Sequence, residues 1–148
     1  MNRCLKIDEE IFIYQFTQGI YSLQEMNAWF EAYDLQNKRD ILVNLFCMVV
    51  QSHPTYAELE TAATDLKKIT SPSAVMLLNR NKPFEKFGYQ ICGLPEKELL
   101  NGFDILLLAL TQSDTRRKLK ENPNECHHWW HKNLSDEKYL ESLRNTFA

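Results

Sequence analysis

The sequence has little glycine and proline, which argues against a fold rich in tight turns. Only 4 glycines and 5 prolines occur in 148 residues, whereas β-sandwiches and barrels join many short strands by glycine- or proline-rich turns. No glycine-rich phosphate loop, nucleophile elbow or dinucleotide-binding fingerprint is present, and Gly88 and Gly93 are isolated. These absences disfavour an all-β fold and the common cofactor-dependent enzymes.

Long basic runs and long apolar runs are also missing. The 17 Lys and Arg residues are outnumbered by 20 Asp and Glu residues, which gives a net charge of -3. A phosphate backbone would require a broad basic surface, and a membrane-spanning helix requires about 20 consecutive apolar residues. The first ten residues lack the apolar core of a signal peptide. We therefore expect no nucleic-acid partner, no membrane and a cytoplasmic location.

The four cysteines are few and far apart. Cys4, Cys47, Cys92 and Cys126 form no Cys-x-x-Cys pair, so neither a disulfide framework nor a paired zinc motif is indicated. Most of them stand among apolar or aromatic residues, which is typical of reduced, buried thiols.

The composition and the hydrophobic spacing predict an all-α protein. With 44% hydrophobic and 25% charged residues, the chain resembles an ordinary globular protein, and we expect residues 1–148 to form a single helical domain. Apolar residues recur at helical intervals along the chain, so we expect a compact bundle of eight to ten short helices. The expected helical segments are 8–18, 22–33, 34–52, 55–69, 73–78, 84–91, 95–110, 113–120, 123–133 and 135–148.

Several of these segments carry helix start and stop signals. Gly19 is expected to end the first, and Ser22 with Glu25 has the capping-box spacing that begins the second. Asp34 or Asn37 can open the third, whose apolar density also permits a buried strand. Other expected start signals are Ser71-Pro72, Pro95-Glu96, Ser113 or Asp114, Pro123, and Ser135.

The densest motif is the hexapeptide Cys126 to His131, which holds three histidines and two tryptophans. At about 100° per residue, a helix places Cys126, Trp129 and Trp130 in one sector and the three histidines nearly opposite. Two large indole rings favour burial of the first sector as a structural anchor. The imidazoles would then point to solvent or to a neighbouring element.

Three interpretations of the histidines stay open. They can simply decorate an exposed helix face, present a surface to a partner, or bind a metal ion. Helical spacing brings His127 and His131, or His128 and His131, together, and His53 or a carboxylate would have to complete the site, with zinc as the expected metal. A Cys126 nucleophile served by His128 is a weaker alternative, because residues two apart on a helix do not face each other.

A basic cluster lies just before the hexapeptide. Arg116, Arg117, Lys118 and Lys120 fall where a helix would end, and cations there interact favourably with the negative end of the helix dipole. Contact with a phosphate or an acidic partner is the alternative.

These C-terminal motifs resemble those of small uncharacterised bacterial proteins grouped as a domain of unknown function. Three segments carry the resemblance: Asp114 to Arg117, Cys126 to His131, and Leu134 to Asp136. Weaker agreement occurs at Gly19, Trp29-Phe30 and residues 71–75. Members of that group share a Cys-x-His-Trp-Trp-His pattern, which here makes Cys126, His128 and His131 the better candidates for a shared role. The resemblance implies a bacterial domain but no reaction.

Two functions follow as hypotheses. The first is a small regulatory or immunity-like module that binds another protein through His127, His128 and His131, with Arg116 and Arg117 at the rim. It requires no cofactor and favours a non-enzymatic role, and it predicts an exposed apolar or aromatic patch of more than a few hundred Å². The second is a metal-binding protein or metalloenzyme that uses the same histidines. The oligomeric state is left open.

Overall fold

The computed structural model describes residues 7–50, 84, 87, 90–91 and 93–147. These residues form seven α-helices and one short 3-10 helix, and they contain no strand. The all-α class is therefore confirmed, although the described part of the chain does not match the expected number of eight to ten helices. The predicted helices at 55–69 and 73–78 lie outside the described residues, and the expectation of a single domain stays a prediction.

Local signals mark the end of the first helix and the starts of the next two. Helix α1 (Ile7–Thr17) has an acidic first turn and is followed by Gly19 at φ 77°, a backbone conformation that glycine adopts without strain. Helix α2 (Leu23–Glu31) has the complete capping box between Ser22 and Glu25. Helix α3 (Leu35–Val50) starts where the Asp34 carboxylate accepts a hydrogen bond from the Asn37 amide.

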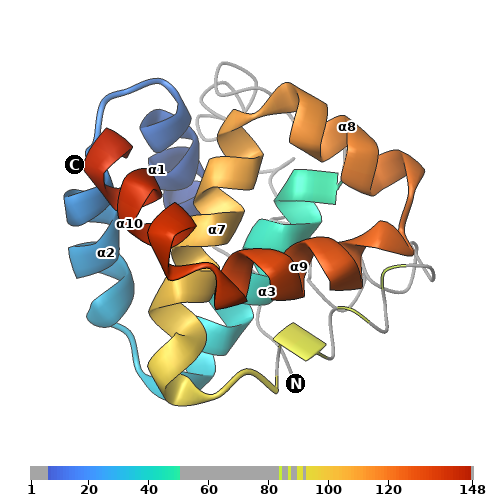
Figure 1. Ribbon diagram of the computed structural model, residues 1–148. Helices are drawn as coiled ribbons and strands as arrows, with labels where there is room; N and C mark the ends of the chain where they lie inside the picture. The colour runs from blue at the N-terminus through green and yellow to red at the C-terminus, as the bar shows by residue number, and fades with distance from the viewer. Residues whose placement is uncertain (1–6, 51–83, 85–86, 88–89, 92, 148) are drawn as a thin grey trace.

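Helices α3 and α7 (Leu99–Thr111) form the centre of the molecule (Figure 1). Helix α2 and the C-terminal α10 (Glu137–Phe147) pack against α7, whereas α8 (Ser113–Glu121) contacts both central helices. Helix α9 (Glu125–Ser135) packs on α7 and α10, and the 3-10 helix η1 (Glu96–Glu98) leads directly into α7. Among the described residues, no helix combines the length and the apolar character that crossing a membrane requires.

An aromatic core joins these helices. Phe30 of α2 stacks on Phe103 of α7 with 4.3 Å between ring centroids, and Trp130 of α9 meets Phe87 edge to face at 5.6 Å. Trp130 lies against Gly102 on α7, where a Cβ atom would be only 2.9 Å from the indole Cη2. A glycine inside a helix costs stability, but here it lets α9 approach α7 closely.

A buried polar group ties three helices together. The Asp104 carboxylate on α7 accepts hydrogen bonds from Asn27 Nδ2 at 2.6 Å and from Arg144 Nε at 2.8 Å, and Arg144 also donates to Asn101. Asp104 is fully buried, and burial raises its pKa, while Asn27 and Arg144 oppose that rise. The carboxylate therefore joins α2 and α10 to α7 through a charge-assisted contact.

Three expected helix starts are displaced by one or two residues. Helix α8 is preceded by Gln112 rather than capped by Ser113 or Asp114, and α9 begins after Asn124, with Pro123 in the preceding turn. The α10 amide of Tyr139 is capped by the Asp136 carboxylate at 2.9 Å. Ser135 cannot serve there because it still belongs to α9, where its hydroxyl donates to the His131 carbonyl.

Candidate functional site

The hexapeptide lies on α9, and its two residue types face different ways. Cys126 and Trp130 are 0% and 1% exposed, and Trp129 is half-buried against the core. His127, His128 and His131 are all exposed. This is the division that the helical spacing predicts. Helix α9 therefore lies at the surface, with its indole side packed against the core and its imidazole side exposed.

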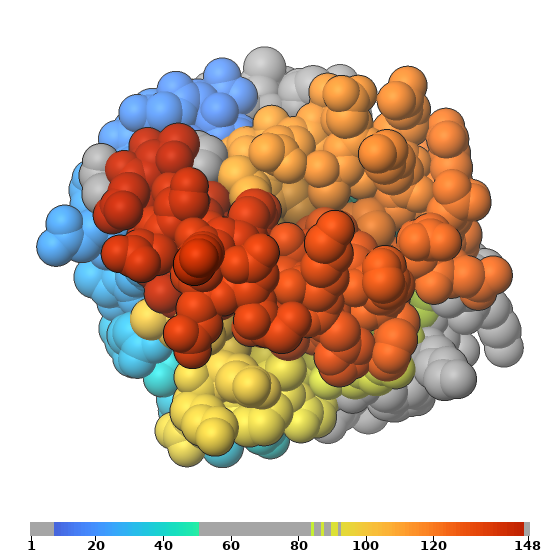
Figure 2. All heavy atoms as spheres, in the orientation of Figure 1, coloured from blue at the N-terminus to red at the C-terminus, as the bar shows by residue number. Residues whose placement is uncertain are grey.

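The three histidines do not form one cluster. The rings of His127 and His131 lie 4.3 Å apart, centroid to centroid, and both line a hollow beside the η1 segment, whereas His128 lines a second hollow beside α8. Figure 2 shows α9 crossing this face between the orange α8 and the yellow start of α7. Because α9 has a neighbouring segment on each flank, its three histidines are divided between two hollows: His127 and His131 line one, and His128 lines the other.

The first hollow, beside η1, has a volume of about 620 Å³. Its wall is partly apolar, with Trp130 and Leu94, and its polar groups include Glu98, His127 and His131. The full set of described lining residues is Gln90, Gly93, Leu94, Pro95, Glu98, His127, Trp130, His131, Leu134 and Ser135.

Gln90 orients one of the two imidazoles in this hollow. Its side-chain Oε1 lies 2.8 Å from Nδ1 of His127. An amide oxygen only accepts hydrogen bonds, so Nδ1 carries the proton and donates. The lone pair of the neutral ring then lies on Nε2, which can coordinate a metal ion or accept a hydrogen bond.

The second hollow, between α8 and α9, has a volume of about 560 Å³. Leu119, which is 2% exposed, and Trp129 supply apolar surface. The described polar groups around them are Thr115, Lys118, Asn122, Glu125, His128 and Lys132. Two ammonium groups against one carboxylate give this hollow a positive character.

Arg116 and Arg117, the expected rim of the histidine face, line neither hollow. Arg117 is exposed and lies 3.5 Å from the Asp114 carboxylate. Arg116 is half-buried and close enough to Tyr14 of α1 to lower the phenol pKa, although burial and Glu10 together raise it. The structure thus separates both arginines from the histidines, and their role in binding stays a prediction.

The Cys126 thiol is placed as a buried apolar group. Burial raises its pKa to about 12, and its sulfur lies 3.9 Å from the Leu119 carbonyl. A nucleophilic cysteine needs a lowered pKa and access to substrate. The geometry therefore argues against a Cys126 nucleophile served by His128.

No group of three His, Cys, Asp or Glu side chains that could hold a metal ion occurs among the described residues. His128 and His131, the pair favoured for metal from the sequence, border different hollows. His53, the proposed additional ligand, lies outside the described residues.

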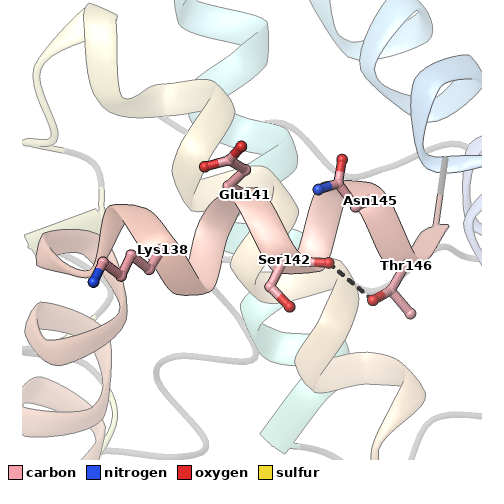
Figure 3. A pocket seen from close by; sticks show the side chains of 5 residues that line it. All are labelled: Lys138, Glu141, Ser142, Asn145 and Thr146. Carbon is pink, nitrogen blue, oxygen red and sulfur yellow. Dashed lines mark hydrogen bonds between the residues drawn. The ribbon is translucent and has the colours of Figure 1, made fainter.

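A third hollow, of about 420 Å³, lies along α10 (Figure 3). All its described lining residues come from that one helix: Lys138, Glu141, Ser142, Asn145 and Thr146. They are exposed, and Thr146 is already bonded within the helix, since its hydroxyl donates to the Ser142 carbonyl at 2.8 Å. With a single helix as its described border, this hollow has no converging walls to hold a ligand.

Three polar residues of the α9 hollows are not among the site residues expected from the sequence: Gln90, Glu98 and Lys132. Lys118 belongs to the basic cluster, for which contact with an acidic partner is one of the two expected roles. Gln90 is 37 positions from its partner His127, so no local spacing signals the contact. Lys132 falls four residues after His128, the spacing that places two side chains on one helix face, and that signal was available.

A family model matches residues 8–133, and the family is described as one of unknown function, DUF5958. The match begins within α1 and includes the whole hexapeptide on α9. No curated protein and no solved structure matches the chain.

Proposed function

The chain belongs to the DUF5958 family of unknown function, and we propose that it is a binding module that receives an acidic segment of another protein in the hollow between α8 and α9. The observation that carries this proposal is the combination of apolar wall and cationic rim around a space of about 560 Å³. Binding sites typically pair an apolar lining with a few placed polar groups, in volumes of roughly 300–1,000 Å³.

The charge at this hollow favours an acidic partner. Lys118 and Lys132 are exposed on opposite walls, one from α8 and one from α9, and His128 adds an imidazole beside them. Glu125 is the only acidic side chain among the described lining residues. The chain as a whole carries a net charge of -3, so this cationic spot stands out from the rest and can orient an acidic partner during association.

The apolar part of the hollow offers an anchor. Trp129 exposes part of its indole next to Leu119, and tryptophan is among the residues that most often dominate binding energy in interfaces. A partner segment that places an apolar side chain against Trp129 and a carboxylate near each lysine would fill both parts of the site.

No large hydrophobic side chain of α8 or α9 is fully exposed, so these two helices do not carry an exposed apolar patch of the kind expected from the sequence. Ile20 and Leu35 are the large hydrophobic side chains that are exposed among the described residues, and neither lies on α8 or α9. Recognition through the hollow therefore depends on a few polar and aromatic contacts. Such an interface is small, which is typical of transient regulatory complexes.

We place this regulatory role in the bacterial cytoplasm, as the sequence predicts. The two described cysteines, Cys47 and Cys126, support that location because both are free and buried. A reducing compartment leaves such thiols unpaired. An immunity-like role is one form that a small binding module can take.

The test is affinity capture from the source cell with matched charge variants. The charge-reversed variant is Lys118→Glu with Lys132→Glu, and the control is Lys138→Glu, an exposed lysine on the outer face of α10. We expect the wild type and the control to capture the same acidic protein, which the double variant loses, with all three proteins equally helical by circular dichroism. Capture that survives charge reversal, or no specific capture by the wild type, would refute the proposal.

A further inference from the structure

We infer that His127 and His131 form a two-imidazole site for a divalent transition-metal ion such as Zn²⁺, on the flank of α9 opposite the proposed protein-binding hollow. The sequence leaves two histidine pairs open for a metal ion, His127 with His131 and His128 with His131, and we choose the first because both of its rings border one hollow. The site is independent of the proposed function, since it shares no described lining residue with the α8–α9 hollow.

The spacing of the two rings fits a shared ion. His127 and His131 are four residues apart on one helix, the arrangement by which paired histidines bind zinc in metalloprotease helices. With Zn–N bonds of 2.0–2.1 Å, two imidazoles on one ion have centroids about 5 Å apart. The observed separation is 4.3 Å with the rings tilted by 59°, so the two rings would have to move apart by about 1 Å to share an ion.

The tautomer of one ligand is already set. Gln90 Oε1, 2.8 Å from Nδ1 of His127, keeps the proton on that nitrogen and leaves Nε2 free to coordinate. Histidines that bind metals usually donate their other ring N–H to an oxygen acceptor in this way, and the acceptor raises affinity by fixing the ring. Gln90 is therefore a positioning residue for the metal site.

The surroundings leave room for the remaining ligands. Both histidines are exposed and border a hollow of about 620 Å³, whose wall also includes the Glu98 carboxylate. With two protein ligands, water completes the coordination. Imidazole suits Zn²⁺, Cu²⁺ and Ni²⁺, and affinity is expected to be highest for Cu²⁺.

The experiment is isothermal titration of the full chain, purified without a histidine tag, with Zn²⁺ alone. We expect one ion per chain and no detectable binding for His127→Ala or His131→Ala at concentrations that saturate the wild type. His128→Ala, on the same helix but outside this hollow, is the matched control and should bind as the wild type does. Gln90→Leu should weaken binding by roughly tenfold.

A second readout identifies the ligands directly. Zn²⁺ should shift the ring nitrogen resonances of His127 and His131 in NMR spectra and leave those of His128 in place. All three histidines are exposed, so the alanine variants should fold normally. Zn²⁺ binding that persists without His127 and His131, requires His128, or is missing in the wild type would overturn the inference. None of these outcomes bears on the Lys118 and Lys132 variants, so the two proposals fail separately.

Discussion

Substituting Gly102 by alanine is expected to destabilise the protein, against the usual preference for alanine in helices. In an ordinary helix interior this change gains about 1 kcal/mol. Here the new Cβ would lie 2.9 Å from Cη2 and 3.3 Å from Cζ2 of Trp130, and 3.1 Å from Leu94 Cδ2. Forcing extra volume into a packed core costs about 1–3 kcal/mol. Because the Trp130 indole is rigid and 1% exposed, we expect the clash to outweigh the gain, with a net loss of up to about 2 kcal/mol.

A double-mutant cycle measured by urea unfolding tests this account. Trp130→Phe removes the outer ring atoms that approach Gly102, so Gly102→Ala in that background should be neutral or stabilising by up to about 1 kcal/mol. The interaction between the two sites would then be on the order of 2 kcal/mol. If Gly102→Ala stabilises the wild type, or costs the same with Phe at position 130, then contact with the indole does not determine the identity of residue 102.

Three further measurements test other parts of the structure. Ser22→Ala should lower the free energy of unfolding by about 1 kcal/mol, because Ser22 Oγ accepts from the Glu25 amide at 3.1 Å; an unchanged urea midpoint would show that the capping box is not needed. Tyr33→Phe should cost about 1.5 kcal/mol in the same assay, since the phenol donates to Glu9 Oε2 at 2.7 Å, and a loss below 0.5 kcal/mol would contradict that role. Burial raises the pKa of Cys47 from 9.0 to about 12. The stability that the buried, protonated thiol contributes is therefore fully present below pH 9 and is lost as the pH rises toward 12. At pH 10.5 ionisation of this thiol in the unfolded chain should lower the free energy of unfolding by roughly 2 kcal/mol. Between pH 8 and pH 10.5, the free energy of unfolding of Cys47→Ala should therefore fall by roughly 2 kcal/mol less than that of the wild type. Equal falls for the two proteins would refute the pKa shift.

Local signals in the sequence account for much of the fold. Gly19 and the pair Ser22 and Glu25 act within a few residues, so their effects on α1 and α2 could be predicted without tertiary information. The cap of α10 was predicted one residue early because Ser135 and Asp136 are both good capping residues. The continuation of α9 through Ser135 decided between them.

The candidate sites depended on tertiary contacts that no spacing reveals. Helical geometry separates the tryptophans from the histidines, but it does not show which neighbours flank α9. The structure places α8 on one side, beside His128, and the η1 segment on the other, beside His127 and His131. Gln90 acquires its position beside His127 only through folding, so neither the division of the histidines nor its orienting partner could be predicted.

The ion pair between Asp104 and Arg144 bears on where the chain can be shortened. The family match ends at residue 133, which suggests that α10 is dispensable. A chain cut there, however, would keep a carboxylate in its interior while losing the guanidinium that compensates it. Removing one partner of a fully buried ion pair costs about 3–5 kcal/mol. The Arg144 side chain is 39% exposed, so we expect a smaller loss here, which is still a sizeable part of the roughly 5–15 kcal/mol that typically holds a protein folded. Arg144 of α10 thus compensates the charge of the buried Asp104 carboxylate. Shortened chains made for expression should therefore retain this helix.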